Sequence, residues 1–114
     1  MRTTINQISF QVGTLAELRT YYQILLNEKV EGMEPRNHGN TWSIYFLDPE
    51  GNRIELYTPT PWHVEQPFGK LFDLNDSVEA VHQQTLEMIR DDPTFCPREQ
   101  WASRLADKIN NATR

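Results

Sequence analysis

The sequence is short of cysteine, of basic runs and of long apolar runs, and each shortage argues against a class of protein. Its single cysteine, Cys96, has no partner for an intramolecular disulfide, and no CxxC pair offers a zinc site. We therefore expect a reducing, cytoplasmic location. The sequence has no cluster of lysine or arginine, and its formal net charge is −5, so a nucleic-acid-binding surface is not expected. The N-terminal residues lack the apolar core of a signal peptide, and no run is long enough to span a membrane.

The first sixty residues carry alternating signals for strands and a helix. Apolar residues alternate along 4–12, which predicts a strand. Thr14 and Glu17 then form a T-x-x-E capping signature, and the apolar spacing that follows predicts a helix over 15–28. Three further strands are expected over 29–34, 41–47 and 53–58, with a loop over 35–40.

The second half of the chain is less regular. Three prolines and no clear period predict a long loop over 58–70. Asp76 and Glu79 form a D-x-x-E pair that opens a helix over about 77–90, and Pro97 suits the first position of a final helix. The predicted class is α+β. The predicted divisions are a strand–helix–three-strand module over 1–60, an irregular linker over 61–75 and a helical extension over 76–114.

The hairpin SIYFLDPEGNRIELY, residues 43–57, carries a carboxylate inside its second strand. The simplest register around its turn places Tyr45 opposite Glu55. One face of the hairpin is then apolar and is expected to lie under the helix over 15–28. The other face combines polar, charged and aromatic residues: Ser43, Tyr45, Arg53, Glu55 and Tyr57. On the first strand, Ile8 and Phe10 are expected on the helix side, and Ile5, Gln7 and Ser9 on the Glu55 side. From spacing alone, a solvated glutamate is the favoured interpretation and a metal ligand is the alternative.

This hairpin, with INQISFQVGTLAELRTYYQ and RNHGNTWSIYF, resembles one βαβββ module of the vicinal oxygen chelate superfamily. That superfamily includes glyoxalases and extradiol ring-cleavage dioxygenases. The similarity covers about residues 3–70, favours the dioxygenase branch and is closest to the second module of a two-module chain. In the family, two modules form one barrel that holds Fe(II) or Mn(II) through two histidines and a glutamate. The resemblance implies a single half-barrel module here, with two additional C-terminal helices.

The resemblance also assigns roles to individual residues. It places the family's glutamate ligand on Glu55 and its second-module histidine on Gln7, while the other histidine belongs to a first module without a counterpart here. It implies that His38 borders the substrate as an acid–base group and that Tyr45 hydrogen-bonds a substrate oxygen. Because an amide oxygen is a weaker ligand than imidazole for Fe(II), a single chain is not expected to be a competent dioxygenase.

Three functions therefore remain open. A homodimer could complete the barrel, bring Gln7 and Glu55 in twice, and give a metal-dependent enzyme that cleaves a catechol-type aromatic. The fold could instead serve as a catalytically degenerate module that binds a small aromatic ligand. A separate partner half-barrel could also supply the missing ligands. Neither nucleic acid nor membrane is expected as a partner.

Overall fold

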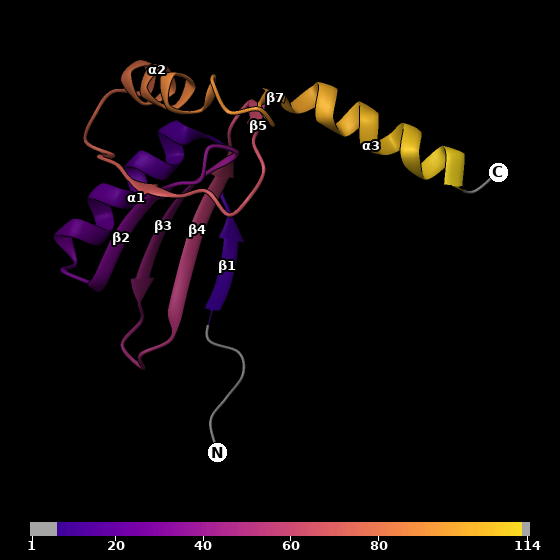
Figure 1. Cartoon of the computed structure of the whole chain (residues 1–114). Coiled ribbons are helices and arrows are strands. Elements are labelled where there is room, and N and C mark those ends of the chain that lie inside the picture. Colours follow the sequence, from indigo (N-terminus) through magenta and orange to yellow (C-terminus); the bar gives the residue numbers. More distant parts are fainter. Residues whose placement is uncertain (1–6, 113–114) are drawn as a thin grey trace.

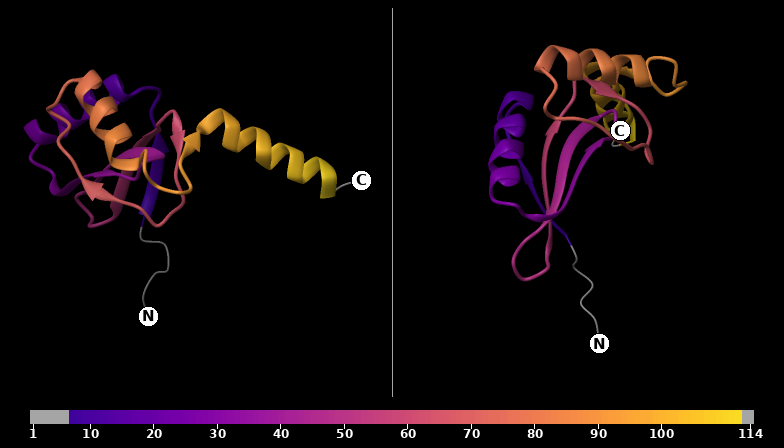
Figure 2. Two further views of the ribbon diagram at one scale, coloured as in Figure 1. Left: turned by 45° about the horizontal axis from the view of Figure 1, so that its top comes forward. Right: turned by 90° about the vertical axis from the view of Figure 1, so that its left-hand side faces the viewer.

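The computed structural model of the protein describes residues 7–112. A five-stranded sheet in the order β1-β4-β3-β2-β6 forms the centre, with α1 against one face and α2 across one end (Figures 1 and 2). The elements are β1 (Gln7–Gln11), α1 (Leu15–Asn27), β2 (Glu31–Asn37), β3 (Thr41–Leu47), β4 (Arg53–Pro59), β5 (Trp62–His63), β6 (Lys70–Leu71), α2 (Val78–Ile89), β7 (Cys96–Pro97) and α3 (Arg98–Ala112). The predicted α+β class is confirmed, and the sheet formed by the described residues is open rather than closed into a barrel.

The strand–helix–three-strand order follows the local sequence signals. Thr14 is the N-cap of α1, and its hydroxyl accepts a hydrogen bond from the Glu17 backbone N–H at 3.1 Å. This contact is the one that the T-x-x-E signature predicts. The pairing of β3 with β4 is also the predicted register, with Tyr45 opposite Glu55. Local capping and turn chemistry therefore position the hairpin that carries the predicted site.

The expected loop over 35–40 is wrong in its first half, because β2 continues to Asn37. Proline lacks a backbone N–H and is tolerated where a strand has a free side. Pro35 pairs with β3, and the pairing of β2 with β6 involves Arg36 and Asn37. The pairing of β2 with β6 thus uses the residues that follow the proline and does not involve Pro35 itself. The loop predicted over 58–70 likewise contains β5 and the start of β6.

Two predicted helix starts are wrong by one residue. The N-cap of α2 is Ser77 rather than Asp76, and the Ser77 hydroxyl accepts a hydrogen bond from the Ala80 N–H at 3.1 Å. Pro97 lies in β7, directly before the first residue of α3. Serine and aspartate are both good N-caps, so the local sequence does not decide between Asp76 and Ser77. The tertiary path of the chain selects Ser77.

The core lies between the sheet, α1 and α2. Its buried members are Leu15, Leu18, Trp42, Ile44, Leu74 and Val81. Thr85 of α2 ties this core to the sheet, because its hydroxyl accepts hydrogen bonds from Trp42 Nε1 at 2.9 Å and Asn37 Nδ2 at 2.8 Å. These buried polar groups are paired, as a stable interior requires.

The edge strand β1 is less covered than its neighbours. It runs parallel to β4, with Ile8 opposite Ile54 and Phe10 opposite Leu56. Ile8 and Phe10 therefore lie on the α1 side, as predicted, yet they are 44% and 53% exposed. The packing of α1 is centred on β3 and β4, so this edge projects beyond it. Ile5, which was expected on the opposite face, lies outside the described residues.

Candidate functional site

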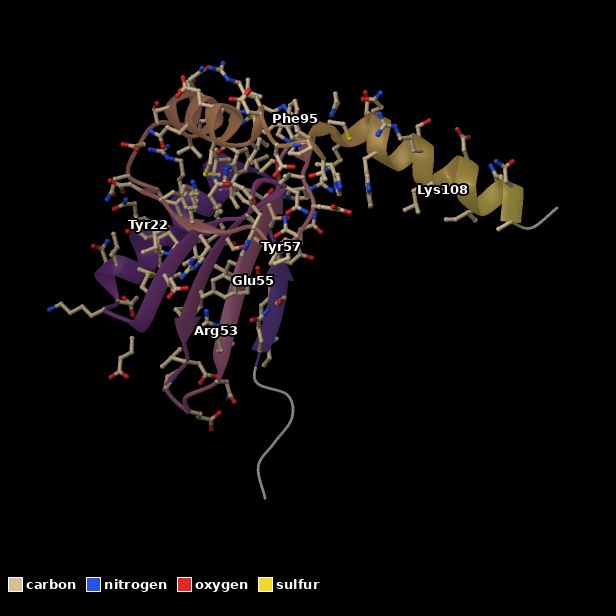
Figure 3. The ribbon with its side chains drawn as sticks, viewed as in Figure 1. Tyr22, Arg53, Glu55, Tyr57, Phe95 and Lys108 are labelled. Carbon is tan, nitrogen blue, oxygen red and sulfur yellow. The ribbon has the colours of Figure 1, made fainter. Side chains whose placement is uncertain are left out.

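Glu55 lies in β4 on the sheet face opposite α1, with β3 on one side and β1 on the other (Figure 3). Its Oε1 accepts hydrogen bonds from Ser9 Oγ at 2.8 Å and from Gln7 Nε2 at 3.1 Å. Its Oε2 accepts one from Ser43 Oγ at 2.8 Å. Three neutral donors from the two neighbouring strands therefore fix the orientation of the carboxylate.

The predicted metal ligands Gln7 and Glu55 are thus brought together, but as a hydrogen-bonded pair. Fe(II) and Mn(II) sites of the two-histidine, one-carboxylate type need imidazole nitrogen beside the carboxylate. Between residues 7 and 112, no group of three histidine, cysteine, aspartate or glutamate side chains could hold a metal ion. One carboxylate, one amide and two serine hydroxyls do not fit this kind of centre. Metal binding by Gln7 and Glu55 stays a prediction that needs ligands from a second half-barrel.

His38 and Tyr45, the predicted catalytic pair, are in direct contact. His38 Nδ1 lies 2.9 Å from the backbone oxygen of Phe68, which can only accept, so this nitrogen carries the proton. His38 Nε2 lies 2.9 Å from the Tyr45 hydroxyl. In the neutral ring this second nitrogen is an acceptor, so the Tyr45 hydroxyl donates to it. The pair is therefore held in one tautomer by the loop that carries Phe68.

Two charged neighbours act on Tyr45. Burial raises the pKa of Tyr45 above its ordinary value, and the carboxylate of its cross-strand partner Glu55 raises it further. Tyr45 therefore keeps its proton at neutral pH and remains a hydrogen-bond donor. The guanidinium of Arg53 lies over the Tyr45 ring, 4.5 Å from its centre, and orients the ring through a cation–π contact.

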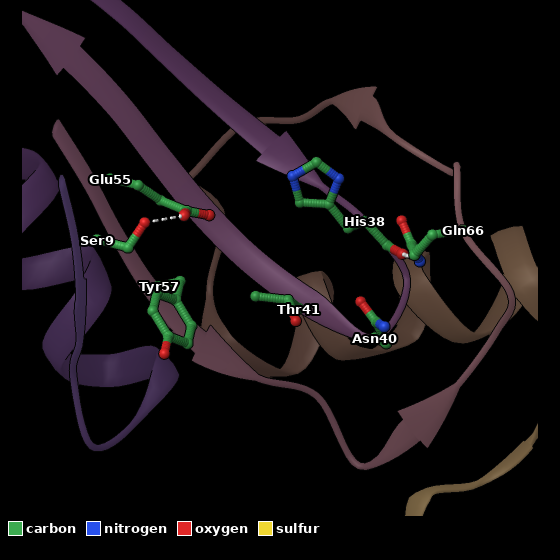
Figure 4. A pocket seen from close by; sticks show the side chains of 7 residues that line it. All are labelled: Ser9, His38, Asn40, Thr41, Glu55, Tyr57 and Gln66. Carbon is green, nitrogen blue, oxygen red and sulfur yellow. Dashed lines mark hydrogen bonds between the residues drawn. The ribbon is translucent and has the colours of Figure 1, made fainter. Parts of the chain in front are cut away.

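A cleft of about 420 Å³ opens over Glu55 and His38 (Figure 4). Its lining residues are Ser9, His38, Asn40, Thr41, Glu55, Tyr57 and Gln66. A second cleft, of about 550 Å³, shares His38 and Gln66 with the first and is otherwise lined by Arg36, Pro67, Phe68 and Gly69. His38 therefore lies between the cleft above the sheet and the second cleft beside the 66–69 loop.

Several residues around Glu55 and His38 were not predicted to have a role. Ser9 and Ser43 were placed on the Glu55 face, but their contacts with the carboxylate were not foreseen. Ser9 lies directly opposite Glu55 in the pairing of β1 with β4, so strand register carried the necessary signal. Gln66 and Phe68 come from a loop without periodicity. Only the tertiary path brings that loop to His38.

The comparisons with known proteins point to dioxygenases of aromatic diols. Biphenyl-2,3-diol 1,2-dioxygenase 2 of Rhodococcus globerulus is 35% identical over 52 residues, which is 46% of this chain and 27% of that protein. Biphenyl-2,3-diol 1,2-dioxygenase 3 of the same organism is 40% identical over 48 residues, which is 42% of this chain and 25% of that protein. The chain thus spans about a quarter of the length of these curated relatives. No family model and no solved structure matches.

This similarity supports a dioxygenase-like relationship, in agreement with the branch that the sequence resemblance favoured. Among the helices between residues 7 and 112, none has the length and apolar character to cross a bilayer.

Proposed function

We propose that the chain is a dioxygenase-like half-barrel that binds a catechol-type aromatic in the cleft over Glu55. The observation that carries this proposal is the convergence of Glu55 and the His38–Tyr45 pair on one open sheet face. A carboxylate has about four acceptor positions, and Glu55 uses three with its serine and glutamine neighbours. It therefore retains capacity to accept from a ligand hydroxyl.

The size and chemistry of the clefts suit a diol with one or two rings. Small-molecule sites usually measure about 300–1,000 Å³, so the first cleft has room for one substituted ring. The diol hydroxyls would donate to Glu55 and form a hydrogen bond with the Tyr45 hydroxyl. A second ring would extend past His38 toward Phe68 and Pro67 in the adjoining cleft. Biphenyl diols, after which the curated relatives are named, have this shape.

Metal-dependent ring cleavage is the second candidate function, and it depends on assembly. Glu55 occupies the family ligand position, but the chain's own residues do not fit Fe(II) or Mn(II). A second copy of this chain or a separate half-barrel would have to supply the remaining ligands. The open β1 edge favours such a partner, because an edge strand exposes unpaired backbone groups. When bound, the metal would supply the site at which oxygen and the diol meet.

The test is an anaerobic calorimetric titration of the protein with catechol, and with 1,2-dimethoxybenzene as a ligand that cannot donate. We expect catechol to bind in the presence of a chelator, and the dimethyl ether to bind at least tenfold more weakly. Glu55→Gln should weaken catechol binding by about tenfold, the size of one charge-assisted hydrogen bond. Glu50→Gln, in the exposed turn after β3, is the matched control.

Equal binding of the two ligands, or unchanged binding by Glu55→Gln, would contradict the binding proposal. Oxygen uptake on adding Fe(II) and catechol would support the second candidate. Absence of uptake by any assembled form of the protein would reject it.

A further inference from the structure

The last helix, α3, extends away from the rest of the molecule (Figures 1 and 2). It packs against the body through β5 and β7, and none of its residues 98–112 is buried. Trp101, Leu105 and Ile109 recur at a spacing of four residues, so they lie on one side of the helix. Trp101 stacks on His63 of the same chain, with ring centres 4.6 Å apart, and is 36% exposed, while Leu105 and Ile109 are 42% and 55% exposed. Isolated helices of about 15 residues are only marginally stable in water, so packing of this stripe against a partner would stabilise α3.

Charge is divided unequally between the C-terminal segment and the body. Residues 98–114 hold four of the eleven basic residues and two of the sixteen acidic ones, which gives this segment a net charge of +2. The remaining 97 residues therefore carry −7. Arg104 and Lys108 lie beside the apolar stripe by helical spacing, and Figure 3 shows Lys108 far from the sheet. A basic, apolar arm on an acidic body is complementary to a second copy of the same chain.

The body presents a surface that matches this arm. Glu17, Tyr21, Ile24 and Glu28 recur at i, i+4, i+7 and i+11 along the outer side of α1. Tyr21 and Ile24 are 42% and 50% exposed, and the two glutamates at the ends of the stripe are also exposed. The opposite flank of α1 is occupied, because Arg19 donates to the backbone oxygens of Leu74 and Asn75.

We propose that α3 of one chain packs along the Glu17–Tyr21–Ile24–Glu28 stripe of α1 in a second copy. Leu105 and Ile109 cover Tyr21 and Ile24, with the exposed part of Trp101 beside them, while Arg104 and Lys108 form ion pairs with the two glutamates. The contact is intermolecular because α3 leads away from α1 of its own chain (Figures 1 and 2). A two-fold dimer repeats the contact, so both arms and both acceptor helices are covered. This proposal is independent of the ligand and of the metal.

The first test measures the oligomeric state of the full chain by sedimentation velocity over a concentration series. We expect a dimer for the natural sequence and at least tenfold weaker association for the double variant Leu105→Asp and Ile109→Asp. Gln100→Asp with Ser103→Asp is the matched control, because it adds the same charge to the opposite side of α3. A monomer at concentrations up to about 1 mM, the range of the weakest specific contacts, would overturn the proposal. Equal effects of the two double variants would also overturn it.

The second test is an exchange of charge across the contact. Lys108→Glu and Glu28→Lys should each weaken association severalfold, and the two together should restore it. Both residues are exposed, so the variants are expected to fold, which circular dichroism checks. Weakening without restoration in the combined variant would show that α3 binds elsewhere than on α1.

Discussion

The two faces of the sheet are made by alternate residues of the same strands, yet they have opposite characters. Ile44 points under α1 and is fully buried, whereas its neighbour Tyr45 lies on the opposite face, in contact with His38, and is partly exposed. The α1 face is held by apolar packing. The Glu55 face is held by hydrogen bonds from Gln7, Ser9 and Ser43 to a carboxylate.

This difference separates stability from chemistry within one layer of backbone. Burial of apolar area provides most of the free energy of folding, and the core cluster that contains Ile44 lies on the side that α1 and α2 cover. The open side keeps water access and polar groups, which are the requirements of a binding site. Substitutions on the two faces should therefore have different consequences for stability.

The largest effect is expected from Ile44→Ala on the covered face. Loss of a fully buried isoleucine side chain should lower the free energy of unfolding by about 2–5 kcal/mol, because a cavity remains beneath α1. Urea denaturation measures this change. Leu71→Ala is the control, since Leu71 is 65% exposed and its loss should change stability by less than about 0.5 kcal/mol. Similar losses in both variants would remove the distinction between covered and open positions.

A smaller effect on stability is expected from Glu55→Gln on the open face. The variant keeps one acceptor oxygen for the serine hydroxyls, so the free energy of unfolding should fall by about 1 kcal/mol or less. Thr85→Val is the comparison on the covered side. It deprives the buried Trp42 and Asn37 donors of their shared acceptor and should cost about 1–3 kcal/mol. Urea denaturation measures the free energy of unfolding of both variants. A larger loss for Glu55→Gln than for Thr85→Val would contradict the assignment of stability to the covered side.

The smallest effect is expected at high pH, where one tyrosine on each side contributes. Burial raises the pKa of Tyr45 on the open face and of Tyr22 on α1, with Glu55 and Asp73 respectively adding to the shift. A raised pKa in the folded state means that the stabilisation is complete below the ordinary value near 10 and is lost as the pH rises above it. Tyr45→Phe and Tyr22→Phe should each reduce the fall in stability between about pH 9 and pH 11. An unchanged fall in both variants would contradict the prediction.

The parts of the fold that were predictable are those specified by neighbouring residues. The Thr14 cap, the helix after it and the β3–β4 register each depend on residues close in sequence, and all three are confirmed. The wrong predictions concern positions at which the local sequence is compatible with two different structures. Asp76 and Ser77 are both competent caps, and Pro35 indicates a loop until the pairing of β2 around it is known.

The candidate site divides in the same way. Strand alternation placed Gln7, Ser9 and Glu55 on one face, and the structure joins them by hydrogen bonds. The His38–Tyr45 contact was not predictable from spacing, because His38 follows the end of β2 and its orientation depends on the Phe68 carbonyl. Residues of the 66–69 loop had no periodicity that could have indicated their place beside the cleft.

The sequence by itself determined the order of the elements, the two characters of the hairpin and the amphipathic stripes of α1 and α3, because these depend on residue spacing. Only the tertiary structure decided that the Glu55 carboxylate is held by three neutral donors, that His38 is held between Phe68 and Tyr45, and that Leu105 and Ile109 of α3 are left exposed. Each of these outcomes depends on contacts between segments far apart in the chain, which the packing of the whole molecule brings together.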